Sequence, residues 1–253
     1  MIKVYQDFAF VYDRLTDDIN YNTWASYIEE IFERNHARPE IVLDLGCGTG
    51  SLSIELSKMG FDMIGLDSSE EMLGIAAEKA AMADRNILFI NQDMREMDLY
   101  GTVGAVVSTL DSLNYLSSIN CLKKVFARVN NFLDKDGFFI FDIHSRYKME
   151  KIFGNNTFHV VNDDIAYIWN CHYDGRRKVC QHDITCFIKS EDMEVEQYDR
   201  FDEFHEERFF SKEEIEQALL EANLKVTNVF DGATFRKTSP KSERWLYVCR
   251  KEK

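Results

Sequence analysis

A glycine-rich turn at the end of an apolar run constrains the fold of this chain more than any other feature. Residues 41–50 read Ile-Val-Leu-Asp-Leu-Gly-Cys-Gly-Thr-Gly. The apolar run predicts a strand that is buried on both faces of a parallel sheet, and a helical pattern follows it. The glycines allow a tight turn and leave no Cβ atoms where a ligand must come close. This turn therefore predicts a site for a nucleoside-bearing ligand at the carboxyl end of the first strand.

Three further apolar runs also end in polar residues, and helical patterns separate them. Because strands alternate with helices, we expect a doubly wound parallel α/β sheet whose ligand crevice lies at the carboxyl strand ends. The residues before the first strand, about 5–35, have helical spacing. Capping-box spacing from Ser68 to Glu71 predicts that another helix starts just after Asp67. The expected strands cover residues 61–66, 86–91, 103–108 and 138–143, and the expected helices between them cover 49–58 and 119–133.

Residues 144–207 break this rhythm. Successive strands are expected at 158–161, 165–173, 179–188 and 193–204, as an antiparallel insertion after the fifth strand. A capping box at Ser211 then begins a helix, and residues 224–230 and 244–249 finish the sheet as an antiparallel pair. The sequence thus predicts a helical segment over 1–36, a core built from 37–143 and 208–253, and the insertion over 144–207.

The glycine spacing resembles motif I of the class I S-adenosylmethionine (SAM) dependent methyltransferases. The chain has D-x-G-x-G-x-G from Asp44, whereas the dinucleotide fingerprint G-x-G-x-x-G would need its third glycine at Ser51. The polar strand ends follow in the family's order, and the resemblance covers roughly residues 37–143. It implies a Rossmann-like sheet of seven strands with the last one antiparallel, SAM as the cofactor and S-adenosylhomocysteine as the product.

The same resemblance implies roles for acids at three strand ends. Asp67 would accept the ribose hydroxyls, Asp93 would take the adenine amine, and Asp44 would lie near the amino acid part of the ligand. Simpler interpretations remain open: Asp67 can favour a helix start, and Asp93 can belong to a turn. Cys47 is expected to offer only its backbone. The predicted cofactor-binding set is Tyr12, Trp24, Asp44, Gly46, Cys47, Gly48, Asp67, Ser68, Met72, Asp93, Met94 and Asp111.

Aromatic side chains precede the sheet. In similar small methyltransferases such a segment covers the cofactor and the substrate as a lid, and aromatic faces suit a sulfonium cation. An aromatic stripe that packs on the core explains the same spacing. The residues concerned are Tyr5, Phe8, Tyr12 and Trp24.

The segment after the fourth strand, Asp-Ser-Leu-Asn-Tyr, indicates the type of acceptor. It resembles enzymes that methylate small molecules, and it lacks the Asn-Pro-Pro-aromatic and Pro-Cys sequences of other subtypes. Asp111, Asn114 and Tyr115 are candidates to position the acceptor or the SAM amino group, although turn capping also explains Asp111 and Asn114. His144 ends the fifth strand and is the candidate general base, with polar surface as the alternative. In-line positioning could also suffice without a strong base.

The charge of the chain bears on its partners. A net charge of −14 repels phosphate backbones, so a nucleic acid is an unfavourable partner. A small-molecule acceptor with a nitrogen or oxygen nucleophile is the prediction, and an RNA methyltransferase or a non-catalytic SAM-binding regulator is the alternative. A dehydrogenase is disfavoured by Asp93 and the glycine spacing. The acidic stretch before residue 208 reads as a solvated face, or as Glu203 or His205 attracting a cationic acceptor.

The remaining predictions concern location and metals. We expect no membrane span and no signal peptide, and six scattered cysteines favour a reducing cytoplasm. Hairpin pairing would set Cys171 opposite Cys180, with His182 and Cys186 on the face of Cys180, but this spacing fits no common zinc pattern, so no metal is expected. Monomer and homodimer are not distinguished.

Overall fold

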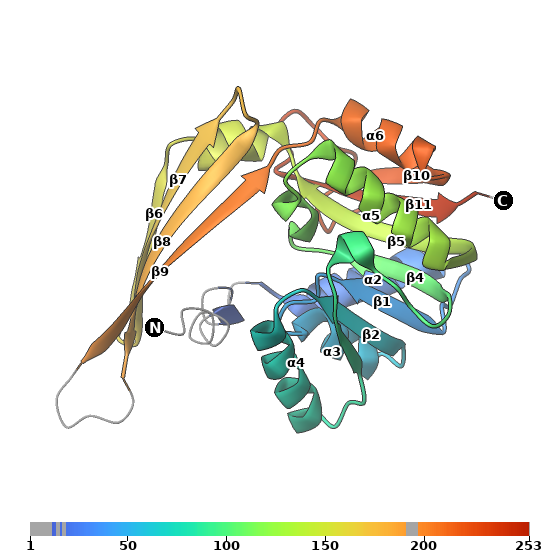
Figure 1. The fold of residues 1–253 in the computed structure, drawn as a ribbon, viewed down its shortest axis with the longest axis horizontal. Coiled ribbons are helices and arrows are strands. Elements are labelled where there is room, and N and C mark those ends of the chain that lie inside the picture. The colour runs from blue at the N-terminus through green and yellow to red at the C-terminus, as the bar shows by residue number, and fades with distance from the viewer. Residues whose placement is uncertain (1–11, 14–15, 17–18, 191–196, 253) are drawn as a thin grey trace.

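The computed structural model describes residues 12–13, 16, 19–190 and 197–252, so the predicted lid residues Tyr5 and Phe8 lie outside it. Two sheets make up the fold (Figure 1). One is a seven-stranded sheet flanked by helices, and the other is a four-stranded sheet that stands beside it. No helix within the described ranges has the length and apolar character needed to cross a membrane.

The larger sheet has the strand order β10-β11-β5-β4-β1-β2-β3. Strands β1 to β5 pair in parallel, and β11 runs antiparallel to both β5 and β10. This confirms the predicted doubly wound sheet with an antiparallel last strand. The order reverses at β1, which lies between β4 and β2, so a ligand crevice is expected at its carboxyl end. The bounds are β1 Ile41–Leu45, β2 Asp62–Asp67, β3 Leu88–Asn91, β4 Val103–Ser108, β5 Leu133–His144, β10 Leu224–Asp231 and β11 Arg244–Lys251.

Helices cover both faces of this sheet. Helices α2 and α3 pack on one face through side chains such as Ile28 and Phe32, and α5 and α6 cover the other face through side chains such as Phe126 and Leu219. Each large side chain buried in this way stabilises the fold by about 1.5–3 kcal/mol, which makes the sheet a rigid support. The bounds are α2 Tyr21–Arg34, α3 Ser51–Lys58, α4 Glu70–Met82, α5 Ile119–Phe132 and α6 Lys212–Glu221.

The helix starts follow local capping. Ser211 forms the predicted capping box with Glu214. The expected cap at Ser68 is wrong, because Ser69 accepts the hydrogen bond from Met72 N. The reason is that β2 continues through Asp67, whose Oδ1 accepts from Ser69 N at 2.9 Å and moves the helix start along by one residue. Short helical turns η1 Met94–Glu96, η2 Ser112–Tyr115 and η3 Lys148–Phe153 follow β3, β4 and β5.

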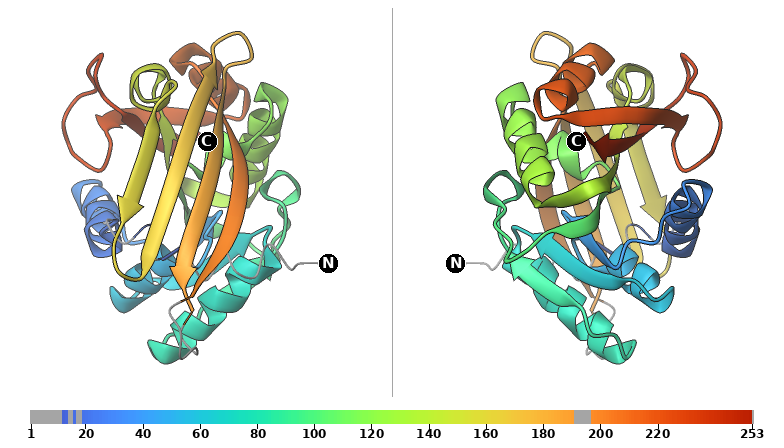
Figure 2. Two further views of the ribbon diagram at one scale, coloured as in Figure 1. Left: turned by 90° about the vertical axis from the view of Figure 1, so that its left-hand side faces the viewer. Right: turned by 90° about the vertical axis from the view of Figure 1, so that its right-hand side faces the viewer.

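The smaller sheet confirms the predicted antiparallel segment after β5. Its order is β6-β7-β8-β9, and its long strands cross in front of the larger sheet when viewed from the side (Figure 2). β9 continues four residues beyond the predicted end at residue 204. The bounds are β6 Thr157–Val161, β7 Ile165–Asp174, β8 Val179–Lys189 and β9 Tyr198–Arg208. The division of the chain into a lid, a core and an insertion stays a prediction.

The register of β7 and β8 corrects the expected cysteine pairing. Cys171 lies opposite His182, and Cys180 lies opposite Tyr173. The four residues 175–178 form the connecting turn, with Lys178 at a φ of 57°, and this loop sets the register two residues away from the expected one. The six cysteines of the chain are all free.

Candidate active site

The glycine loop after β1 is open toward the crevice. Gly46, Gly48 and Gly50 have φ values of 78°, 53° and 72°, which favour glycine. A Cβ added to Gly48 would meet no atom within 4 Å, so this backbone faces free space. Gly48 N donates to Asp67 Oδ2 at 2.9 Å, which holds the end of β2 against the loop. The structure therefore brings the predicted loop and the predicted ribose acid together.

Asp44 lies beneath this loop with 2 % exposure. Its Oδ2 accepts from Ser53 Oγ at 2.6 Å. Burial raises the pKa of Asp44 to about 7, although the Ser53 hydroxyl favours the ionised form. Asp44 also lines a small cavity beside the glycine loop. A cationic group that entered this cavity would restore the charge of the carboxylate.

Only some of the other predicted cofactor residues lie next to the glycine loop or the cavities. Arg95 binds the Asp93 carboxylate and holds the pKa of that acid below its usual range. Met94 reaches the loop, since a Cβ on Gly46 would lie 3.3 Å from its Cε. Burial raises the pKa of the Cys47 thiol, which fits a backbone role. Ser68 is exposed and Met72 half-buried, and neither lines the two cavities beside the loop.

The described part of the N-terminal segment is fastened to the glycine loop. Thr49 Oγ1 donates to Asp13 Oδ1 at 2.6 Å, and Lys79 also binds the Asp13 carboxylate. Tyr12 lines both the small cavity and a larger one beside it, and Trp24 lines the larger one. Tyr12 and Trp24 thus border the cavities, and their role as a lid stays a prediction. Asp13 and Lys79 were not predicted.

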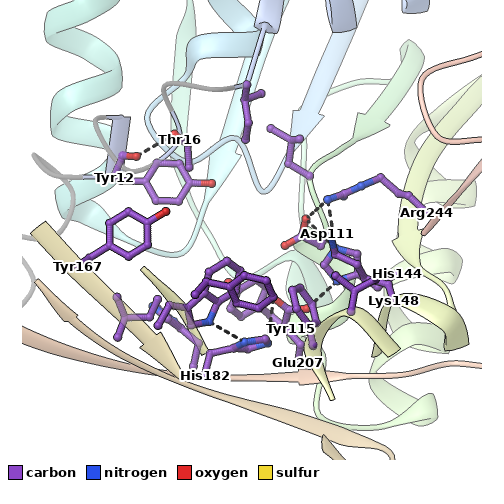
Figure 3. A pocket seen from close by; sticks show the side chains of 18 of the residues that line it. Tyr12, Thr16, Asp111, Tyr115, His144, Lys148, Tyr167, His182, Glu207 and Arg244 are labelled. Carbon is purple, nitrogen blue, oxygen red and sulfur yellow. Dashed lines mark hydrogen bonds and ion pairs between the residues drawn. The ribbon is translucent and has the colours of Figure 1, made fainter. Parts of the chain in front are cut away.

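The larger cavity has a volume of about 660 Å³ and lies between the crevice and the four-stranded sheet (Figure 3). Aromatic rings form much of its wall on the sheet side. The Trp169 ring lies 5.4 Å from that of Phe153 and 5.2 Å from that of Phe158. Tyr115, which is 50 % exposed, meets His205 edge to face at 5.9 Å.

Four charged or polar side chains meet at one end of this cavity. His144 Nδ1 lies 2.7 Å from Glu207 Oε2, and Arg244 Nη2 lies 2.8 Å from Asp111 Oδ1. Arg244 Nη2 is also 3.1 Å from His144 Nε2, and Nη1 binds the buried Asp142. Figure 3 shows Asp111, His144, Glu207 and Arg244 converging from different elements.

These contacts fix the tautomer of His144. A guanidinium has only donors, so His144 Nε2 accepts from Arg244, and the ring proton on Nδ1 is donated to Glu207. Burial disfavours the Glu207 charge, but the two imidazoles that face it, His144 and His182, hold its pKa well below the usual range. The arrangement is a carboxylate–imidazole pair at the cavity wall, and it can take a proton on Nε2 once Arg244 releases that nitrogen.

The backbone around the cluster is held by a buried amide and a strained turn. Asn114 Oδ1 accepts from His144 N at 3.0 Å, and Asn114 Nδ2 donates to the Arg208 carbonyl at 2.8 Å. Asn114 thus joins the ends of β5 and β9 and does not line the cavity, so its role in positioning a ligand stays a prediction. Leu110 and Asp111 have φ values of 56° and 62°, a rare conformation that turns Asp111 into the cavity.

A second imidazole extends the cluster into the smaller sheet. The Trp169 indole Nε1 donates to His182 Nδ1 at 3.0 Å, so the proton of a neutral His182 is on Nε2. That nitrogen faces Glu207 Oε1 at 3.5 Å. Glu203 lies on the same face of β9 and is buried, with no hydrogen-bond partner for its Oε1 within the described residues.

Glu207 and Arg244 were missed in the sequence. The signal for Glu207 was present, because β-strand alternation puts Glu203, His205 and Glu207 on one face. Arg244 lies opposite His144 in the β5–β11 ladder. No sequence pattern gives that register. Asp111, Tyr115 and His144, by contrast, all line the cavity as candidates for chemistry.

By spacing alone, Asp111, His144 and Glu207 could hold a metal ion, because one ligand atom from each lies within 4.8 Å of the others. Arg244 Nη2 already contacts the Asp111 oxygen and His144 Nε2 from that position. The Arg244 guanidinium therefore lies where a metal ion bound by these three residues would lie.

Comparisons with known proteins identify the family. The model of a methyltransferase domain matches residues 42–137. The YqeM protein of Bacillus subtilis, whose name assigns it to the methyltransferases, is 38 % identical over 251 residues, which is 99 % of this chain and 98 % of that protein. The chain belongs to the SAM-dependent methyltransferase family.

Solved structures agree with this assignment. A SAM-dependent methyltransferase from Clostridium acetobutylicum superposes with a TM-score of 0.88 at 32 % identity, covering 97 % of this chain and 98 % of that one. DesVI of Streptomyces venezuelae shares the fold, with a TM-score of 0.78 at 22 % identity over 98 % of this chain and 99 % of its own.

The residues around the glycine loop are suited to bind SAM. Gly48 leaves space that a Cβ would fill, the Asp67 carboxylate is bound to the Gly48 backbone N–H, and Asp44 is a buried acid beside the loop. Gly48, Asp67 and Asp44 would hold the nucleoside and the amino acid part of the cofactor. Asp93 would have to exchange its Arg95 contact to take the adenine amine.

Proposed function

We propose that this protein transfers the methyl group of SAM to a nitrogen or oxygen atom of a small molecule held in the larger cavity. The observation that carries this proposal is the cavity of about 660 Å³ between the cofactor crevice and the antiparallel sheet, with a carboxylate–imidazole pair at one end. A volume of this size suits a small ligand. Tyr12 lines both this cavity and the glycine-loop cavity, which supports a direct path between the two.

Each residue has a role in the proposed reaction. When bound, SAM supplies a methyl group on a sulfonium, which is a good leaving group. His144 takes the acceptor proton on Nε2, and Glu207 stabilises the imidazolium through Nδ1. Arg244 releases Nε2 at that point and keeps its contacts with Asp111 and Asp142. Asp111, Tyr115 and the aromatic wall hold the acceptor in line with the methyl group, and Tyr12 and Trp24 exclude water.

The names of several similar proteins support a small acceptor. Two neighbours in fold are a sugar N-methyltransferase, KedS8, and an amino pentose methyltransferase, CalS10. The glycine/sarcosine N-methyltransferase of Halorhodospira halochloris is 28 % identical over 51 % of this chain. An RNA acceptor is less well supported, because the net charge is −14 and the polar end of the cavity is rich in acids. We also propose a cytoplasmic location, since the six cysteines are free.

A non-catalytic SAM-binding regulator is the other candidate. Burying a pair such as His144 and Glu207 carries a desolvation penalty, and titratable groups of this kind cluster at catalytic sites. The pair therefore favours an enzyme. The test is to incubate the protein with SAM and a library of small amines, alcohols and phenols, and to measure release of S-adenosylhomocysteine. Turnover with some members and none with a His144→Ala variant supports the proposal. Binding of SAM with no turnover of any member would favour the regulator.

A further inference from the structure

The charges at the polar end of the cavity limit the kind of acceptor, provided that the proposed function holds. Asp111 and Glu207 contribute two carboxylates, and the nearest cation is Arg244, which is shared with the buried Asp142. Lys148 also lines the cavity, but Glu243 Oε2 neutralises it at 2.7 Å. His182 is neutral when its Nδ1 accepts from Trp169, so even with Asp142 counted as neutral this end carries a net negative charge. A carboxylate or phosphate acceptor would therefore be repelled.

The hydrogen-bonding groups at this end also favour a cationic acceptor. The Asp111 carboxylate can accept hydrogen bonds beyond its contact with Arg244, and His144 Nε2 can accept one once Arg244 releases it. Three of the five Arg244 N–H groups are directed at Asp111, Asp142 and His144. A protonated amine brings several N–H donors and no acceptor, which complements such a surface. A neutral alcohol has one O–H donor, so it could donate to only one of these acceptors.

The lining of the rest of the cavity indicates which kind of group carries the acceptor atom. Phe153, Phe158 and Trp169 form a continuous aromatic wall, with ring centroids 5.2–5.4 Å apart from one ring to the next. Ile152 and Ile184 complete an apolar lining. Such a wall buries a ring or a comparable apolar group, and aromatic faces also attract an ammonium.

We infer that the acceptor is an amine, protonated in solution, carried on an apolar ring-bearing body. The ammonium group lies at the Asp111–His144–Glu207 end, and the body lies against Trp169. One N–H proton passes to His144 Nε2, giving an imidazolium paired with Glu207. The freed nitrogen lone pair then forms the new N–C bond as the methyl–sulfur bond breaks, and that electron pair remains on sulfur. The products are a methylated ammonium and S-adenosylhomocysteine, so charge and atoms balance.

Three probes that share a phenyl body test this inference: 2-phenylethylamine, 2-phenylethanol and 3-phenylpropanoate. Their binding to the protein saturated with S-adenosylhomocysteine is measured by calorimetry. We expect the amine to bind at least about tenfold more tightly than the alcohol and the acid to bind most weakly. The preference should shrink in Glu207→Gln and Asp111→Asn. It should persist in Glu206→Gln, because Glu206 is on the opposite, exposed face of β9.

The outcomes separate this inference from the proposed function. Equal or tighter binding of the alcohol or the acid overturns the inference, as does the absence of amine binding, while S-adenosylhomocysteine binding leaves the methyltransferase assignment standing. The wild-type comparison of the three probes needs no variant, so a folding defect in Glu207→Gln does not weaken the test. If S-adenosylhomocysteine itself failed to bind the folded protein, the proposed function would fall first and the inference with it.

Discussion

The buried acid beneath the glycine loop gives a quantitative prediction for cofactor binding. Burial raises the pKa of Asp44 from 3.8 to about 7 in the free protein. This shift corresponds to about 4 kcal/mol against the ionised form. If Asp44 faces the amino group of the ligand, the ammonium binds only the ionised carboxylate. Binding then releases a proton from Asp44 at any pH below about 7.

The sign and size of the effect follow from that coupling. Below pH 7 the fraction of ionised Asp44 falls about tenfold per pH unit, so the Kd for SAM should rise about tenfold per unit. From pH 7 to pH 5 the expected loss of affinity is about fiftyfold, because half of Asp44 is already protonated at pH 7. The ligand does not cause this change, because an α-amino group with a pKa of about 7.7–8.0 stays protonated throughout that range.

The assay is calorimetric titration with S-adenosylhomocysteine at pH 5, 6 and 7. Two controls isolate Asp44. 5′-Methylthioadenosine lacks the amino acid part and should show little pH dependence, and Asp44→Asn should bind more weakly at pH 7 with a flat profile. A Kd for S-adenosylhomocysteine that is constant from pH 5 to pH 7 would refute the reasoning. A matching slope for 5′-methylthioadenosine would assign the titration to another group.

Three further predictions concern the cluster and the loop. Glu207→Gln should lower the rate of methyl transfer by about 10²–10⁴ and leave the affinity for SAM unchanged. Glu206→Gln should change neither quantity. Equal rates in the two variants would contradict a role for the carboxylate–imidazole pair. Arg244→Ala leaves Asp142 buried without its cation and should cost about 3–5 kcal/mol in urea unfolding, whereas a loss below about 1 kcal/mol would show that the pair is not structural. Gly48→Ala should lose about 1–2 kcal/mol of stability, because its φ of 53° disfavours alanine, but no atom lies within 4 Å of the new Cβ and the protein should still fold. It should bind S-adenosylhomocysteine poorly, and unimpaired binding would place the ligand elsewhere.

Much of the fold could be predicted from the sequence because local patterns and core burial agree along residues 41–143. The glycine loop, Asp67 at the end of β2 and the antiparallel sheet after β5 all follow from apolar runs, turns and alternation. The cap at Ser69 instead of Ser68 shows the limit: whether a strand stops before or after Asp67 depends on its own contacts with Ser69 N and Gly48 N.

The polar end of the cavity was only half predictable. Asp111 follows the end of β4 and His144 ends β5, where a crevice is expected, and both could be named from position alone. Glu207 and Arg244 arrive from β9 and β11, more than sixty residues later in the chain, and their proximity to His144 depends on how two sheets pack. The acidic composition around Glu207 favoured a solvated face, and only the packing of β9 against the core shows it to be buried.

The most direct test of the central claim is calorimetric titration of S-adenosylhomocysteine into the wild-type protein and two aspartate variants of β2. Asp67→Ala removes the carboxylate beside Gly48, and Asp62→Ala removes an exposed acid at the opposite end of the same strand. The account predicts binding by the wild type and Asp62→Ala and loss of binding by a folded Asp67→Ala. Equal affinities in all three proteins would contradict cofactor binding at the glycine loop.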